Sequence, residues 1–218
     1  MDIDFWKQRW KDRQTGFHLE SVNPHLINCW DLLSINQKAT VFVPLCGKSL
    51  DIIWLASLGL NVTGVECSEL AVQEFLNENH LNYQQTKDNN FTVYTSDNIR
   101  LLHGDYFSLV SELMQEVSMV YDRASLVAMP VDMRKEYVNK LNEILPEKVT
   151  ILLVTLEYDQ HLMNGPPFSV SQNEVMSLFQ DRYKVKQLLF NNILDASPRF
   201  KQRGLDYLYE KVYLLKRK

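Results

Sequence analysis

The stretch VFVPLCGKSLDIIWLASLG, from Val41 to Gly59, has the pattern of a strand, a tight turn and a helix. Residues 41–43 form the short apolar run of a buried strand. Apolar side chains then recur at helical spacing from Leu50 to Leu58, and Gly59 ends the helix. This unit predicts an α/β sheet, because a strand that passes directly into a helix can begin a parallel crossover connection. The turn at 44–49 is where a nucleotide-binding protein keeps its ligand loop.

The turn matches neither of the two best-known glycine-rich loops. Gly47-Lys48-Ser49 has the ending of a phosphate loop, but Phe42 stands where that loop needs its first glycine. The dinucleotide pattern needs three glycines, and this turn contains one. One glycine still allows the backbone to approach a ligand closely, although a pyrophosphate would be poorly accommodated. The turn alone leaves two interpretations open, a ligand-binding turn without pyrophosphate and a plain connection.

Outside this stretch, strand patterns alternate with helical ones, and no repeat or linker divides the chain. This alternation predicts one domain, residues 1–218, with a parallel α/β sheet covered by helices on both faces. The last two strand patterns have no helix between them and are expected to be antiparallel neighbours. In such sheets, ligands bind beyond the carboxyl ends of the strands. We predict strands at 41–43, 61–65, 119–121, 149–156, 185–190 and 207–215, paired strands within 91–102, helices at 69–80, 133–145 and 172–179, and a helical arm at 1–40.

Glu66 is the residue that favours a ligand-binding turn. It follows Gly47 by 19 residues and ends the second strand. That spacing is close to the value of about 20 at which an acidic residue binds ribose hydroxyls, since a carboxylate can accept both hydrogen bonds of a diol. The alternative role, an acid at a helix N-terminus, could be filled by Glu69 alone. A nucleoside ligand without pyrophosphate points to S-adenosylmethionine, with Asp105 and Tyr106 as further candidates to hold the adenine.

Three other features each have a structural alternative. Asp122 and Arg123 are expected to form an ion pair near the cleft, or else a purely local salt bridge. The stiff loop 165–168 could wall an acceptor pocket, although most such loops are only connections. Cys46 is interpreted as a residue that positions the turn, because no histidine has motif-level support as its partner in nucleophilic catalysis.

The composition argues against several classes of protein. The net charge of -4 and the scattered basic residues give no footprint for nucleic-acid binding. No apolar run approaches the roughly 20 residues that span a bilayer, and residues 1–7 lack a signal-peptide layout, so we expect a cytoplasmic protein without a membrane partner. The three cysteines form no CxxC pair and the five histidines no HExxH motif, which predicts reduced thiols and no metal site. No interface pattern stands out, so a monomer is expected.

Further short motifs occur in order from near residue 5 to near residue 215. They are Trp6-x-x-Arg9-Trp10, Gly16-Phe17-His18, Val43-Pro44-Leu45-Cys46-Gly47-Lys48, Gly64-Val65-Glu66, Asp122-Arg123-Ala124, Gly165-Pro166-Pro167-Phe168 and Tyr209-Glu210-Lys211-Val212-Tyr213-Leu214-Leu215. Together they resemble the thiopurine S-methyltransferase family, with the Pro-Leu-Cys-Gly-Lys turn as the most specific piece. The short N-terminal arm looks like that of the bacterial branch. Ala124-Ser125 is a small departure, since some members have Gly-Ala after the arginine.

The resemblance implies a Rossmann-like class I methyltransferase fold. Its central sheet would be mostly parallel and seven-stranded, with an antiparallel C-terminal strand pair, and residues 1–40 would cover the cofactor site. The implied activity is transfer of a methyl group from S-adenosyl-L-methionine to the sulfur of thiopurines and other aromatic or heterocyclic thiols, which leaves S-adenosyl-L-homocysteine.

Matching positions also imply roles for individual residues. Trp10, Leu45, Glu66 and Arg123 would bind the cofactor, and Phe17, Arg123 and Arg199 would bind the substrate. No residue is assigned as a catalytic base, because thiopurines and aryl thiols ionise readily and an arginine can favour the anionic form of the acceptor.

Three other functions compete with this one. The nearest is a related methyltransferase that acts on halide, inorganic thiol, selenium or tellurium acceptors, because acceptor pockets diverge while folds persist. A nicotinamide-dependent oxidoreductase belongs to a different class, and the missing glycines of the turn count against it. A binding protein without catalytic activity is the third.

Overall fold

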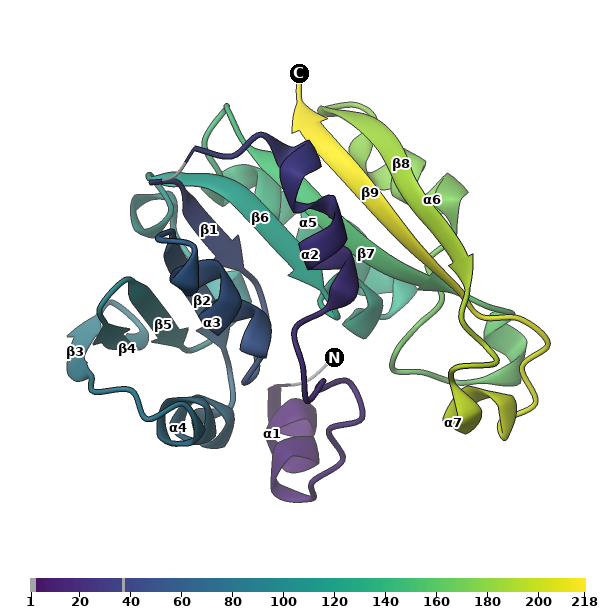
Figure 1. The fold of residues 1–218 in the computed structure, drawn as a ribbon, viewed down its shortest axis with the longest axis horizontal. Helices are drawn as coiled ribbons and strands as arrows, with labels where there is room; N and C mark the ends of the chain where they lie inside the picture. The colour runs from purple at the N-terminus through teal and green to yellow at the C-terminus, as the bar shows by residue number, and fades with distance from the viewer. Residues whose placement is uncertain (1–2, 37) are drawn as a thin grey trace.

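The computed structural model describes residues 3–36 and 38–218. Its strands are β1 (Thr40–Val43), β2 (Asn61–Glu66), β3 (Gln84–Asp88), β4 (Phe91–Ser96), β5 (Ile99–His103), β6 (Val117–Arg123), β7 (Thr150–Glu157), β8 (Tyr183–Asn192) and β9 (Tyr209–Arg217). They form one sheet with the order β3-β4-β5-β2-β1-β6-β7-β9-β8 (Figure 1). Strands β5, β2, β1, β6 and β7 are parallel to their neighbours in this series, and β9 lies antiparallel between β7 and β8. The prediction of a mostly parallel sheet is confirmed.

Helices cover both faces of this sheet. The α-helices of the described residues are α1 (Ile3–Lys11), α2 (Pro24–Leu33), α3 (Leu50–Ser57), α4 (Glu69–Glu78), α5 (Val131–Ile144), α6 (Gln172–Phe179) and α7 (Pro198–Lys201). Figure 1 shows α2 and α3 in front of the sheet and α5 and α6 behind it. Leu26 of α2, Ile52 of α3 and Phe75 of α4 belong to one buried cluster. Tyr137 of α5 and Phe179 of α6 belong to the other, so the predicted coverage of both faces is confirmed.

The expected seven strands are present as β5-β2-β1-β6-β7-β9-β8, and a hairpin of β3 and β4 extends one edge. Strands β4 and β5 are the pair predicted within 91–102. Strand β3 was not predicted, because all of its residues are exposed and its sequence, QQTKD, has no apolar alternation. Its pairing with β4 through the backbone therefore leaves no signal in the side chains.

The prediction that no helix lies between the last two strands is wrong. Helix α7 is a single short turn there, and none of its residues is buried. It begins with Pro198, which is favourable in the first turn of a helix, but it has no apolar stripe that a sequence pattern could reveal. Strands β8 and β9 are nevertheless antiparallel neighbours, as expected.

The predicted N-terminal arm divides into two parts with different positions. Helix α2 packs its apolar side against the sheet, whereas α1 lies next to α4 beyond the carboxyl ends of the parallel strands (Figure 1). Residues 1–2 and 37 of the arm lie outside the described residues. In the part of the chain that the structure describes, no helix has the length and apolar character needed to cross a membrane.

Candidate functional site

A cavity of about 430 Å³ opens at the carboxyl ends of β1, β2, β6 and β7, at the edge where the sequence predicts a ligand. Its volume lies within the range of about 300–1,000 Å³ that is usual for small-molecule sites. The six residues to which the family resemblance assigns a cofactor or substrate role all line this one cavity: Trp10, Phe17, Leu45, Glu66, Arg123 and Arg199. The tertiary structure therefore gathers residues that are up to 189 positions apart in the sequence.

The turn after β1 has an unusual backbone and packs against α1. Gly47 has a φ of +52°, and a Cβ atom at this position would lie 2.9 Å from the ring of Trp10. Glycine is therefore required both for the backbone conformation and for the approach of the indole. Leu45 and Ala124 adopt positive φ values of 45° and 64° without being glycine. Such residues cost of order 1–3 kcal/mol each and cluster at functional sites.

The lysine of the Gly-Lys-Ser ending is held by carboxylates. Lys48 Nζ lies 3.0 Å from Glu74 and 2.6 Å from Glu78, both on α4. Burial alone would lower the pKa of Lys48, but these two carboxylates raise it. Arg13, from the loop after α1, pairs with the same Glu74. Glu74 thus connects the N-terminal arm to the turn, and the Lys48 ammonium is already neutralised by the protein.

Glu66 joins the turn to the end of β2. The N–H of Gly47 donates to its Oε2 at 2.9 Å, and the N–H of Ser68 donates to its Oε1 at 2.8 Å. Only 5% of Glu66 is exposed, and burial raises the pKa of its carboxyl while these backbone donors oppose the rise. A carboxylate oxygen has more than one lone pair, so each oxygen can still accept a ligand hydroxyl.

The predicted ion pair between Asp122 and Arg123 is absent. Adjacent residues of a strand point to opposite faces of the sheet, so their side chains separate. Asp122 is fully buried, and its carboxylate accepts the hydroxyl of Tyr137 at 2.8 Å and the N–H of Leu126 at 3.1 Å. Burial raises the pKa of this carboxyl to about 6.

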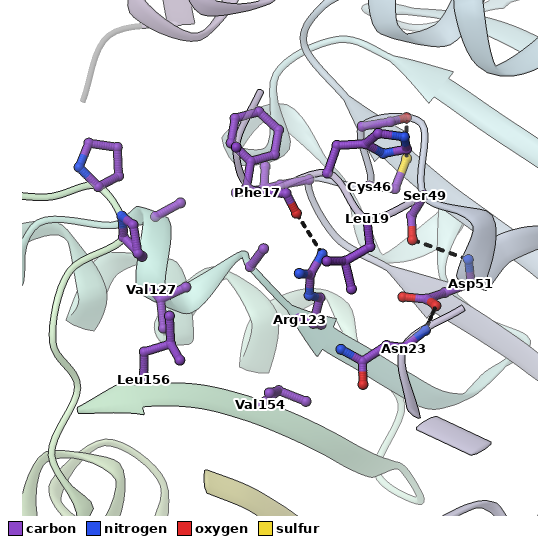
Figure 2. Close-up of a pocket in the computed structure, with 18 of the residues that line it drawn as sticks. Phe17, Leu19, Asn23, Cys46, Ser49, Asp51, Arg123, Val127, Val154 and Leu156 are labelled. Atoms are coloured by element: carbon purple, nitrogen blue, oxygen red, sulfur yellow. Dashed lines mark hydrogen bonds between the residues drawn. The ribbon is translucent and has the colours of Figure 1, made fainter. Parts of the chain in front are cut away.

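Arg123 instead joins the arm to the sheet on the cavity side. Its Nη1 donates to the carbonyl oxygen of Phe17 at 2.8 Å, as the dashed line between these residues in Figure 2 shows. The Phe17 ring makes edge-to-face contacts with Trp6 at 5.7 Å and with Trp10 at 5.5 Å between centroids. Three aromatic rings and one guanidinium therefore form a single wall, assembled from α1, its following loop and β6.

Two further features predicted to contact the substrate, Arg199 and the stiff loop 165–168, also contribute to the cavity. Arg199 of α7 lies so close to Gly16 that a Cβ there would be 2.9 Å from its Nη1. Pro166 and Pro167 of the stiff loop line the cavity, and their role as an acceptor wall stays a prediction. The aromatic tip of that loop does not line the cavity, because Phe168 folds back over Gly165.

The loop 103–107, considered for the adenine, is not among the segments that line the cavity. Asp105 accepts the N–H of Phe107 at 3.0 Å and so caps a short 3-10 helix. Tyr106 is buried and stacks on Tyr137 with 4.7 Å between ring centroids. The Gly-Asp turn therefore has a structural role here.

Several polar residues of the cavity were not predicted. Asp51 accepts the N–H of Asn23 at 2.7 Å, and both residues line the cavity (Figure 2). Glu210 of β9 also lines the cavity and lies 2.6 Å from His25 Nε2. The position of Asp51 in the first turn of α3 is only a weak signal for a cavity residue, because an acid there is equally expected to interact favourably with the helix dipole. Glu210 has no local signal, because only the return of β9 beside β7 brings it here.

The surroundings of both cysteines at the cavity disfavour the thiolate form. Burial raises the pKa of Cys46 well above its usual value, and burial together with the nearby Glu66 carboxylate raises that of Cys67. The Cys46 Sγ lies over Gly64, where a Cβ would approach it to 2.7 Å. This packing agrees with the interpretation of Cys46 as a residue that positions the turn.

The described fold is shared with solved methyltransferase structures. A 1,6-didemethyltoxoflavin-N1-methyltransferase from Burkholderia thailandensis, solved with S-adenosylhomocysteine, superposes with a TM-score of 0.65 at 12% identity, over 99% of this chain and 87% of that one. A methyltransferase from Anabaena variabilis gives a TM-score of 0.64 at 14% identity, over 99% and 95% of the two chains. The fold is that of the class I S-adenosylmethionine-dependent methyltransferases.

Sequence comparison places the chain within this class. The model of the thiopurine S-methyltransferase family matches residues 1–218. A thiopurine S-methyltransferase from Pseudomonas fluorescens (strain SBW25) is 46% identical over 215 residues, with 99% of both chains covered. Another, from Shewanella sp. (strain W3-18-1), is 42% identical over 218 residues, with both chains covered completely. The chain belongs to the thiopurine S-methyltransferase family and is an S-adenosylmethionine-dependent methyltransferase.

Proposed function

We propose that this enzyme methylates the sulfur of thiopurines and other aromatic or heterocyclic thiols. The observation that supports this acceptor class is that Phe17, Arg123 and Arg199 line the same cavity, because an aromatic ring and two guanidinium groups suit a flat, anionic thiolate. The names of the relatives in the family support the same class of acceptor.

The cavity has the groups that an S-adenosylmethionine ligand needs. Glu66 ends β2 and can accept the ribose hydroxyls. Leu45 and the Trp10 indole lie beside Gly47, where the lack of a side chain lets a ligand come close to the protein backbone. Among the described residues, Arg9 Nε and Tyr121 Oη are buried without a hydrogen-bond partner and belong to residues that line the cavity. Unpaired buried donors of this kind are expected to meet polar groups of a ligand. Arg123 completes the proposed cofactor site.

The protein's role in the reaction is mainly alignment in a dry pocket. S-Adenosylmethionine supplies a methyl group on a positively charged sulfur. The in-line geometry of the transfer requires the acceptor sulfur to be held on the far side of that methyl group, which the wall of Phe17, Pro166 and Pro167 can enforce. Arg123 and Arg199 favour the thiolate form of the acceptor through their fixed charge. Helix α1 and its following loop exclude water from one side of the cavity. We expect the single domain to act as a monomer.

One incubation series tests the acceptor. The protein is mixed with methyl-labelled S-adenosylmethionine and, separately, with 6-mercaptopurine, substituted thiophenols, halides, sulfide and selenium or tellurium oxyanions. We expect label on the sulfur of the aromatic and heterocyclic thiols. Label on an inorganic acceptor alone would instead identify the related small-molecule activity, and label on no acceptor would refute the proposal.

Glu66→Ala tests the cofactor site independently of the acceptor. Loss of the ribose contacts should weaken S-adenosylhomocysteine binding by about 1–3 kcal/mol, measured by titration calorimetry. Because Glu66 also accepts the Gly47 N–H, the isosteric Glu66→Gln variant should retain more of the turn geometry and lose less affinity. Unchanged affinity in both variants would remove Glu66 from the site.

A further inference from the structure

The acceptor proton needs a destination. Transfer of a methyl group from a sulfonium to a thiol R–SH releases one proton for each turnover. Two carboxylates of the cavity already have backbone donors: Glu66 accepts those of Gly47 and Ser68, and Asp51 accepts that of Asn23. The third, Glu210, accepts no backbone N–H among the described residues and lines the cavity together with Arg123 and Arg199, the arginines proposed to hold the acceptor.

Strand register places Glu210 opposite Arg123 across β7. Arg123 is paired with Val154, and Glu210 is paired with Leu156. Val154 and Leu156 are two residues apart and share one face of β7, so their partners face the same side of the sheet. With neighbouring strands about 4.8 Å apart, the two Cα atoms are roughly 10–12 Å apart. Arg123 and Glu210 therefore lie on the two sides of β7, and both residues line the cavity together with Val154 and Leu156.

His25 holds the Glu210 carboxylate in place. Its Nε2 lies 2.6 Å from Glu210 Oε2, and only 8% of the histidine is exposed. In the described ranges, His25 Nδ1 is buried and has no partner. In the tautomer that carries its hydrogen on Nε2, the ring donates to Glu210 and leaves no buried, unpaired N–H at Nδ1. The other oxygen, Glu210 Oε1, accepts none of the hydrogen bonds found in the described ranges.

We propose that Glu210 accepts the proton of the acceptor thiol and that His25 is its positioning residue, an inference that rests on the proposed S-methyltransferase function. The S–H bond breaks, its electron pair stays on sulfur, and the proton moves to Glu210 Oε1. The thiolate then takes the methyl group of S-adenosylmethionine, and the carboxylic acid returns its proton to solvent after the product leaves. Arg123 stabilises the thiolate, and Glu210 holds the proton that would otherwise return to the sulfur.

Other charged and titratable groups surround Glu210 and contribute to any pH profile. The cavity also contains Asp51 of α3, Tyr121 and Arg123 of β6, Arg199 of α7 and Arg203 just beyond it, while His25 of α2 makes the direct contact. Because these groups remain in a Glu210 variant, a change in the profile between wild type and variant reports on Glu210 itself.

Glu210→Gln tests the proposal with two thiophenols, one protonated and one ionised at the assay pH. We expect kcat on the protonated thiol to fall by about 100-fold, which is typical of a lost general base, and kcat on the ionised thiol to stay close to wild type. The loss should disappear as the pH rises above the pKa of the thiol. Glu157→Gln is the matched control, because it removes a neighbouring carboxylate that pairs with Lys211 and lies outside the cavity.

A second readout does not depend on turnover. With S-adenosylhomocysteine bound in place of the methyl donor, the ultraviolet absorbance of the bound thiol measures its thiolate fraction. Wild type should bind the thiolate below the pKa of the free thiol, and Glu210→Gln should bind the neutral thiol. His25→Ala should reproduce part of this change and His25→Gln, which keeps an N–H donor, should restore it.

The outcomes separate the two proposals. Equal kcat losses on both thiols, or an unchanged thiolate fraction, would overturn the role of Glu210 and leave the S-methyltransferase function intact. Wild-type protein that methylates no thiol would overturn both. Calorimetric binding of S-adenosylhomocysteine and the thermal midpoint of each variant show whether the protein is folded, so that a loss of structure is distinguished from a loss of proton transfer.

Discussion

Replacing Asp122 with asparagine should raise the free energy of unfolding at neutral pH. The carboxylate of Asp122 is fully buried, and its hydrogen-bond donors, the Tyr137 hydroxyl and the Leu126 N–H, are both neutral. Asparagine has nearly the same shape. Its amide oxygen can accept the Leu126 N–H, and its amide group can donate to the Tyr137 hydroxyl oxygen. The variant therefore keeps these two contacts and removes a buried charge.

The size of the effect follows from the raised pKa. Burial raises the pKa of Asp122 from 3.8 to about 6. At about 1.36 kcal/mol per pKa unit, that difference corresponds to about 3 kcal/mol. Because the pKa is higher in the folded state, folding binds protons: this stability is fully present below pH 3.8 and is lost as the pH rises through about 6. Asparagine imitates the protonated form, so its advantage should reach about 3 kcal/mol near pH 7.5 and about half of that near pH 5.

Urea unfolding of wild type and Asp122→Asn at these two pH values measures both numbers, provided that the slopes agree. Asp195→Asn is the control, because Asp195 is fully exposed beside Lys201 and its pair should contribute little. An equal gain at both pH values would show that the charge is not the cause. A lower urea midpoint for Asp122→Asn than for wild type near pH 7.5 would mean that the hydrogen bonds of the carboxylate stabilise the fold by more than the burial of its charge destabilises it.

Two other substitutions test the packing around the turn. Glu74→Gln removes the carboxylate shared by Arg13 and Lys48 and should weaken S-adenosylhomocysteine binding, measured by calorimetry, by about 1 kcal/mol. Glu78→Gln is the control and should change this affinity less, because it leaves the Arg13–Glu74 ion pair in place. Equal affinities of the two variants would show that the ion pairs of Glu74 do not support the binding site. Gly64→Ala places a Cβ 2.7 Å from Cys46 Sγ and 3.0 Å from Leu101 and should cost about 1–3 kcal/mol in thermal unfolding. Cys46→Ala in the same chain should recover part of that loss, and purely additive losses would contradict the proposed overlap.

Local patterns were sufficient for most of the fold. The apolar run at 41–43, the helical spacing before Gly59 and the mainly apolar stretch 149–156 each depend on neighbouring residues, so their elements were predicted correctly. Strand β3 and helix α7 were missed because their residues are exposed and have no apolar pattern to report. In both cases the backbone is held by neighbouring elements rather than by its own side chains.

The candidate site divides in the same way. Gly47 and Glu66 could be connected by counting, since their spacing is set by one helix and one strand, and the family motifs supplied the remaining predicted residues. Sequence adjacency misled for Asp122 and Arg123, because strand alternation sends one side chain into the core and the other into the cavity.

The sequence by itself determined the class of fold, the turn and the family, because those depend on short-range spacing and on motifs. Only the tertiary structure decided which polar groups meet. The antiparallel return of β9 brings Glu210 beside β7, and the packing of α2 brings His25 to it across 185 positions. Such long-range juxtaposition is fixed by strand order and register, which no local pattern records.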